Sequence, residues 1–69
     1  KGVYRKVDLT LDVSAAKKRS QLYELGTIHN EGFDDFGNSL FTMTLSEDEW
    51  NMIKVWPEIL RFNVLDELK

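Results

Sequence analysis

The feature that most constrains the fold is a change in hydrophobic period at residue 14. Within the segment 3–13, apolar and polar residues alternate strictly from Val7 onward, which is typical of a half-buried β-strand. The apolar face of this strand consists of Val7, Leu9, Leu11 and Val13. From residue 15 the apolar positions recur at helical spacing, which predicts a helix over 15–25. The chain therefore begins with a strand that is followed directly by a helix.

Both ends of this helix carry residue types that suit helix termini. Ser14 offers a side-chain oxygen that suits the N-cap position. Gly26 follows the last periodic residue and suits the left-handed position at which many helices end. We therefore expect Ser14 to cap the helix and Gly26 to end it.

The next part of the sequence predicts an antiparallel hairpin. Segments 27–33 and 39–45 are rich in Thr, Ile, Phe and Leu, and alternate residues of the second segment are apolar. Between them, residues 34–38 (DDFGN) supply the Asp, Gly and Asn that tolerate turn conformations.

A second helix is predicted after the hairpin. Ser46 and Glu49 have the spacing of a capping box, and the first turn contains three acidic residues that suit the helix dipole. The helix is expected to reach Pro57, with Trp50 packed on the sheet and Trp56 either in the core or on a contact surface.

The predicted order is β-α-β-β-α, with a possible final edge strand. The pattern leaves open whether residues 58–68 form a helix or that strand. We expect both helices to cover one face of a three- or four-stranded sheet, since strand–helix–strand crossovers have a preferred hand. The fold class is thus α+β, a small two-layer sandwich that is ferredoxin-like or a truncated variant of it. Residues 1–69 form a single domain, whose second sheet face meets solvent or a partner.

The composition leaves few ways to build a catalytic or metal centre. The 69 residues include no cysteine and one histidine, His29, so neither a disulfide nor a zinc site is expected. The sequence contains no Walker A, G-x-G-x-x-G, G-x-S-x-G or H-E-x-x-H pattern. We therefore expect no catalytic residue, metal site or cofactor in this chain. No stretch approaches the roughly 20 apolar residues that span a bilayer, so no membrane partner is expected.

The charges are distributed unevenly along the chain. Residues 1–19 hold six Lys or Arg against two Asp, whereas residues 20–69 hold three Lys or Arg against ten Asp or Glu. Lys17, Lys18 and Arg19 open a helix, where backbone amides and cations together favour anions such as nucleic-acid phosphates. The candidate residues for binding RNA or another partner are Lys17, Lys18, Arg19, Arg5 and Lys6. The alternative is that these cations form an ordinary solvated face.

The same segments resemble a known family. VDLTLDVSAAKKRSQLYELGTI (7–28), DDFGNSLFTMTLSEDEW (34–50) and PEIL (57–60) are similar in order and spacing to the C-terminal domain of HflX-type GTPases. The matching residues are Arg19, Leu22, Tyr23, Leu25, Gly26, Ile28, Asp35, Gly37, Glu49, Trp50 and Pro57.

The resemblance implies a C-terminal fragment of a cytoplasmic, ribosome-associated GTPase. In such a protein GTP and Mg²⁺ belong to an upstream domain, and this chain is a non-catalytic module that docks or positions the GTPase. The implied partners are the large ribosomal subunit or its RNA and the adjacent GTPase domain. The alternative function is a generic protein–protein interaction module that uses its open sheet face or an edge strand.

Overall fold

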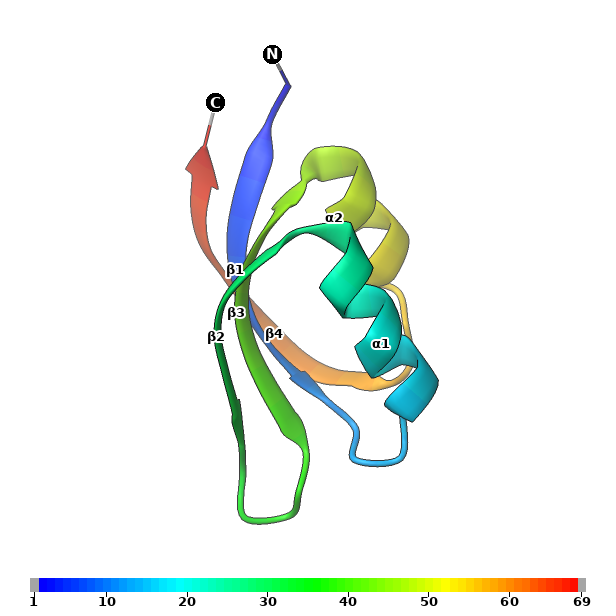
Figure 1. Ribbon diagram of the computed structural model, residues 1–69. Helices are drawn as coiled ribbons and strands as arrows, with labels where there is room; N and C mark the ends of the chain where they lie inside the picture. Colours follow the sequence, from blue (N-terminus) through cyan, green and yellow to red (C-terminus); the bar gives the residue numbers. More distant parts are fainter. Residues whose placement is uncertain (1, 69) are drawn as a thin grey trace.

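Four strands and two helices follow one another in the order β-α-β-β-α-β (Figure 1). The computed structural model describes residues 2–68, without the side chains of Glu67 and Leu68, so both ends of the expected 1–69 domain lie outside the described residues. The elements are β1 (Tyr4–Leu11), α1 (Ala16–Leu25), β2 (Thr27–Phe33), β3 (Ser39–Ser46), α2 (Glu47–Ile53) and β4 (Ile59–Leu68).

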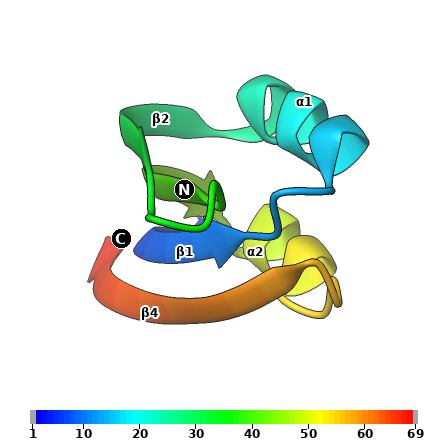
Figure 2. The ribbon, with the colours of Figure 1, turned by 90° about the horizontal axis from the view of Figure 1, so that it is seen from below.

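The strands form one four-stranded sheet in the order β2-β3-β1-β4, and each neighbouring pair is antiparallel. Both helices lie on the same side of this sheet, so the molecule has two layers (Figures 1 and 2). This element and strand order is the ferredoxin-like arrangement, which confirms the predicted α+β sandwich. Residues 59–68 form the final edge strand, the alternative that the sequence left open.

The core lies between the sheet and the helices. β1 and β3 pair in a register that sets Val7 opposite Met43 and Leu9 opposite Phe41, so the apolar residues of both strands share one face. The buried apolar residues are Val7, Leu9, Leu11, Ala15, Leu22, Phe41, Met43, Leu45, Trp50 and Ile53. Complete burial of each large side chain is worth about 1.5–3 kcal/mol. This core stabilises a chain that has no disulfide.

The predicted capping box begins α2. The Ser46 hydroxyl accepts the Glu49 N–H at 3.2 Å, and the Glu49 carboxylate accepts the Ser46 N–H at 2.9 Å. The helix ends at Ile53, earlier than the expected end at Pro57. Trp50 is buried, as predicted, and Trp56 is half-buried and packs against the core.

The start of α1 differs from the prediction. β1 ends at Leu11, and Val13 is exposed instead of extending the apolar face. The Asp12 carboxylate accepts both the N–H and the hydroxyl of Ser14, at 2.8 and 2.6 Å. Because the Ser14 side chain is hydrogen-bonded in this local turn, it does not cap the helix as predicted. The N-cap residue is Ala15, which forms no side-chain hydrogen bond.

The end of α1 also differs from the prediction. Gly26 has an extended backbone, with φ −114°, rather than the expected left-handed one, because β2 begins at the next residue. A Cβ atom at this position would lie 2.1 Å from the carbonyl oxygen of Thr44 and 2.9 Å from a methyl group of Leu45. The position therefore needs glycine, because the backbone between α1 and β2 approaches β3 closely here.

The predicted turn at 34–38 is closed by its own side chains. The Asp34 carboxylate accepts the backbone N–H groups of Phe36 and Asn38, each at 2.9 Å. Gly37 supplies the positive φ, at 85°. The Asn38 side-chain oxygen accepts the Val13 N–H at 2.9 Å, which ties the hairpin to the β1–α1 connection.

We predict that Gly26→Ala lowers the free energy of unfolding by about 1–3 kcal/mol, because the added methyl group overlaps the Thr44 carbonyl. Gly32→Ala is the matched control, since a Cβ there meets no atom within 4 Å. Urea denaturation of the two variants measures the difference. Equal stabilities would contradict the close approach of the Gly26 backbone to β3.

Candidate functional site

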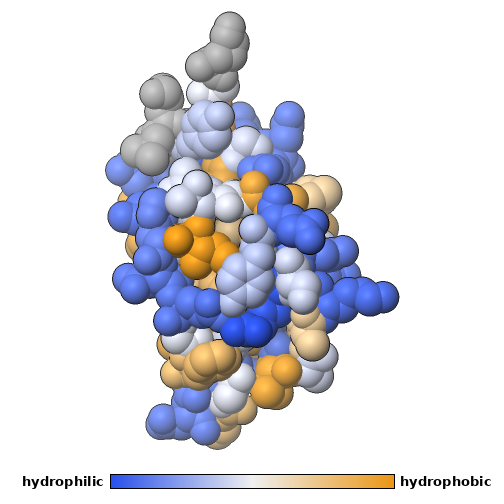
Figure 3. All heavy atoms as spheres, viewed as in Figure 1, coloured by the Kyte–Doolittle hydropathy of each residue, from blue (hydrophilic) through white to orange (hydrophobic). Residues whose placement is uncertain are grey.

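The three predicted cations occupy the first turn of α1, on the side of the molecule where β2 and α1 lie nearest the viewer in Figure 1. That surface is mainly hydrophilic, with apolar groups scattered among polar ones (Figure 3). Lys17 is exposed and forms no ion pair with any part of residues 2–68. Lys18 and Arg19, by contrast, have carboxylate partners within the protein. The triplet is therefore not a uniform cationic patch.

Lys18 borders a groove between the two helices. Its ammonium group lies 4.0 Å from the Glu58 carboxylate and 5.0 Å from the centre of the Trp56 ring. The groove has a volume of about 400 Å³ and is lined by Lys18, Gln21, Glu24, Leu25, Met52 and Trp56. Lys17 itself is exposed and lies one helical turn before Gln21, which lines this groove, and the aromatic wall of the groove, Trp56, is half-buried.

Arg19 belongs to a polar cluster between α1 and β2. Its guanidinium pairs with the Glu31 carboxylate and lies 5.5–5.6 Å from the rings of Phe33 and Tyr23. The Tyr23 hydroxyl donates to the same carboxylate. This hydrogen bond and the nearby Arg19 lower the pKa of Glu31, and the same bond raises the pKa of Tyr23. Arg19 is therefore paired mainly with Glu31, within the protein itself.

The structure does not bring Arg5 and Lys6 together with the triplet. They lie near the beginning of β1, whereas α1 begins beyond its far end, roughly 20 Å away along a strand that rises about 3.3 Å per residue. The Arg5 guanidinium lies 3.4 Å from the carboxylate of Glu47, at the start of α2. Lys6 lies on the opposite face, in register with Thr44 of β3. The five candidates thus form at least two separate groups.

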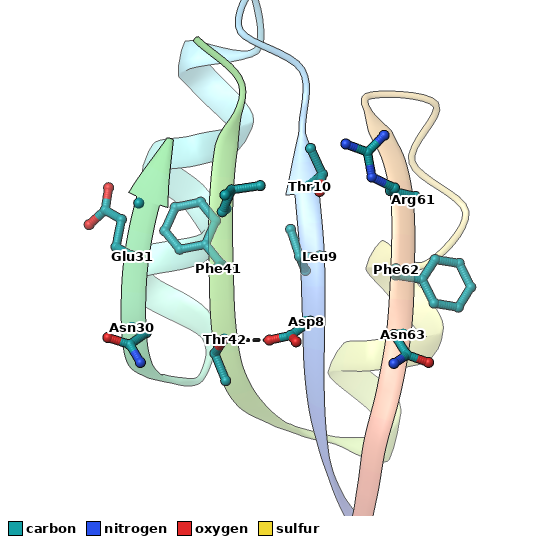
Figure 4. Close-up of a pocket in the computed structure, with 12 residues that line it drawn as sticks. Asp8, Leu9, Thr10, Asn30, Glu31, Phe41, Thr42, Arg61, Phe62 and Asn63 are labelled. Carbon is teal, nitrogen blue, oxygen red and sulfur yellow. Dashed lines mark hydrogen bonds between the residues drawn. The ribbon is translucent and has the colours of Figure 1, made fainter. Parts of the chain in front are cut away.

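The open face of the sheet carries a second hollow. The sequence predicted only that this face meets solvent or a partner, and it did not predict the hollow. It has a volume of about 530 Å³ and crosses all four strands (Figure 4). Its open-face residues are Asp8 and Thr10 of β1, Asn30 and Gly32 of β2, Leu40 and Thr42 of β3, and Arg61 and Asn63 of β4. The signal for Asp8 and Thr10 was present in the sequence, because strict alternation places them opposite Val7 and Leu9.

Most of the open-face side chains in this hollow are polar and of mixed charge, and Leu40 adds apolar surface. The Thr42 hydroxyl donates to the Asp8 carboxylate, and the Arg61 guanidinium lies 3.9 Å from the carboxylate of Asp34 in the β2–β3 turn. Burial raises the pKa of Asp34, but hydrogen bonds from Asn38 and Phe36 outweigh it, so the net direction is downward. The ring of Phe41 in β3 borders the hollow but points to the core and is buried, and the open-face residues of β1 and β3 here are Asp8, Thr10, Leu40 and Thr42. These residues do not form the aromatic platform on which bases stack.

His29 and the acidic residues do not form a metal site in the described structure. The His29 ring nitrogen Nε2 lies 2.8 Å from the Thr44 hydroxyl. Among residues 2–68 there is no group of three or more His, Cys, Asp or Glu that could hold a metal ion. No helix in this part of the chain is long and apolar enough to cross a membrane.

Comparison of the chain with protein-family models, with curated proteins and with solved structures gives no match. The functional argument consequently depends on the residues and geometry described above.

We predict that Tyr23→Phe raises the pKa of Glu31, because the variant loses the hydrogen bond that favours the carboxylate. A lowered folded-state pKa stabilises the protein above the ordinary value of 4.5, and this contribution is lost as the pH falls through the lowered pKa. Acidification below about pH 4.5 should therefore cost the variant less stability than the wild type. NMR titration of the Glu31 carboxyl, with denaturation at each pH, measures both effects. An unchanged Glu31 titration would show that the hydroxyl contributes nothing.

Proposed function

We propose that this chain is a non-catalytic accessory domain of an HflX-like GTP-binding protein that acts in the cytoplasm. In this proposal it docks or positions the GTPase on the large ribosomal subunit, while GTP and Mg²⁺ are held by the adjacent GTPase domain. The residues of the resemblance support it because several occupy positions on which the fold depends. Leu22 and Trp50 are buried, Gly26 permits the close approach of its own backbone to β3, and Gly37 has a positive φ.

The observation that supports the ribosomal contact is the exposed Lys17, one helical turn before Gln21 of the groove that Lys18 and Trp56 border. A cation near a helix start suits a phosphate of RNA, and an aromatic wall suits a neighbouring base. The pair between Lys18 and Glu58 is partly exposed, and such pairs contribute at most about 1 kcal/mol, so a phosphate can compete for Lys18.

The open sheet face suits the second proposed partner, the GTPase domain, better than it suits RNA. On the open face, the hollow there carries one acid, Asp8, and a single cation, Arg61. This balance of charge does not favour a polyanion. A protein surface, with apolar groups as well as donors and acceptors, is the better match for this mixed face.

A generic protein–protein interaction module remains the second candidate. The observation that favours it is the edge strand β4, which exposes several large apolar side chains. Binding of this kind depends on those side chains and not on Lys17.

We predict that the chain co-sediments with purified large ribosomal subunits at low salt and dissociates at higher salt, because phosphate contacts release counterions. Lys17→Glu should weaken binding severalfold and reduce the slope of log affinity against log salt by about one. Sedimentation over a salt series measures both quantities.

Lys6→Glu is the matched control, since it makes the same change of charge on the other face of the molecule. Equal loss with both variants would indicate a general charge effect and contradict a specific contact at Lys17. Absence of co-sedimentation by the wild type at low salt would overturn the ribosomal proposal and favour the second candidate.

A further inference from the structure

The two edges of the sheet differ in length and in chemistry. β2 has seven residues, a register shift next to His29, and exposed side chains that are mostly polar. β4 has ten residues. Leu60, Phe62, Val64 and Leu65 of β4 are each 41–49% exposed. Sheet edges are normally protected by short length, charge, proline or bulges, and the middle of β4 has only a single charge.

The middle of β4 is regular enough to accept another strand. Residues 61–64 pair without interruption with residues 7–10 of β1, and the two register shifts lie outside this stretch, at 60 and 65. In an antiparallel pair, half of the backbone N–H and C=O groups point away from the neighbouring strand. Within residues 2–68, no strand pairs with this outer row of groups.

The helix layer leaves one flank of β4 uncovered. Phe62 and Val64 share the helix side of the sheet with Leu9 and Val7. The Phe62 ring meets the edge of Trp50, with ring centres 4.9 Å apart, yet half of Phe62 stays exposed. An apolar strip therefore runs beside the open row of backbone groups.

We propose that a second copy of this chain covers this edge, with β4 pairing antiparallel with β4 and joining the two four-stranded sheets into one. The charges of β4 are self-complementary in that arrangement. Arg61 lies towards one end of the strand and Asp66 towards the other, both on the open side of the sheet. A two-fold axis between antiparallel strands brings each Arg61 to the end that carries Asp66 of the second copy.

The alternation of faces restricts the register of this pair. Cross-strand neighbours share a face, so Phe62 must lie opposite an apolar residue on the helix side of the second copy. With Asn63 at the two-fold axis, Phe62 of each copy lies opposite Val64 of the other. Arg61 then lies opposite the bulge at 65–66, where Asp66 is on the same side of the sheet. The backbone pairing, the apolar contact of Phe62 with Val64 and the approach of Arg61 to Asp66 are therefore all compatible with this register.

This association is independent of the ribosomal contact proposed above, and its first test is the oligomeric state. We expect sedimentation equilibrium to show a reversible rise from the mass of one chain to that of two, because one strand edge is a small interface. Val64→Lys should raise the dissociation constant at least tenfold. Val13→Lys, a second exposed valine located outside the sheet, should leave it unchanged.

A crosslink tests the register directly. The chain has no cysteine, so Asn63→Cys introduces its sole thiol at the proposed axis. Paired strand residues have Cα atoms about 4.5–5.5 Å apart, within the range of a disulfide. We expect rapid formation of a covalent dimer, and slow formation for Asn30→Cys, on the same face but at the β2 edge.

Several outcomes would overturn the proposal. A wild-type chain that stays monomeric up to millimolar concentration would show that a second copy does not cover β4. A dimer that survives Val64→Lys, or one that crosslinks as readily through residue 30 as through residue 63, would place the interface elsewhere. Circular dichroism of each variant separates loss of pairing from loss of the fold.

Discussion

The antiparallel pairing of β1 with β3 is the constraint on which the rest of the structure depends. In this register Val7 and Leu9 face the same side as Met43 and Phe41, so one face of the sheet centre is apolar and the other polar. Both helices must then cover the same face, because only that face needs burial. The same alternation places Asp8 and its polar neighbours on the opposite face, where the open hollow lies.

The two helices contact the two edge strands of the sheet in different ways. α1 reaches β2 through a polar contact, in which Arg19 and Tyr23 hold Glu31. On the β4 side, α2 offers the contact of Trp50 with Phe62, and half of that ring remains exposed. The helix-side flank of β2 is therefore held by hydrogen bonds and charge, whereas that of β4 remains apolar and can be buried by a further strand.

Features governed by neighbours in the sequence were predictable, whereas features governed by tertiary contacts were not. The alternation of β1 and the capping box at Ser46 depend on local spacing, and both were predicted. Gly26 was predicted to end the helix because glycine often does so. The structure instead requires glycine there because a side chain would overlap the Thr44 carbonyl, which belongs to a strand distant in sequence. The position of Glu31 depends on the register shift beside His29, which moves Glu31 to the helix face, beneath α1. No local sequence pattern predicts such a shift, so the ion pair of Arg19 with Glu31 was not predicted.

The uneven charge of the sequence has a structural explanation in these pairs. Cations from the basic first part of the chain meet acids from the acidic remainder: Arg5 with Glu47, Lys18 with Glu58, and Arg19 with Glu31. A helix that begins with three cations loses some stability to its own dipole, and two of these tertiary pairs offset that loss. Charge asymmetry along a chain is thus not by itself evidence for an external anion. Lys17 is the cation of the triplet that the fold leaves exposed and without an ion pair among residues 2–68.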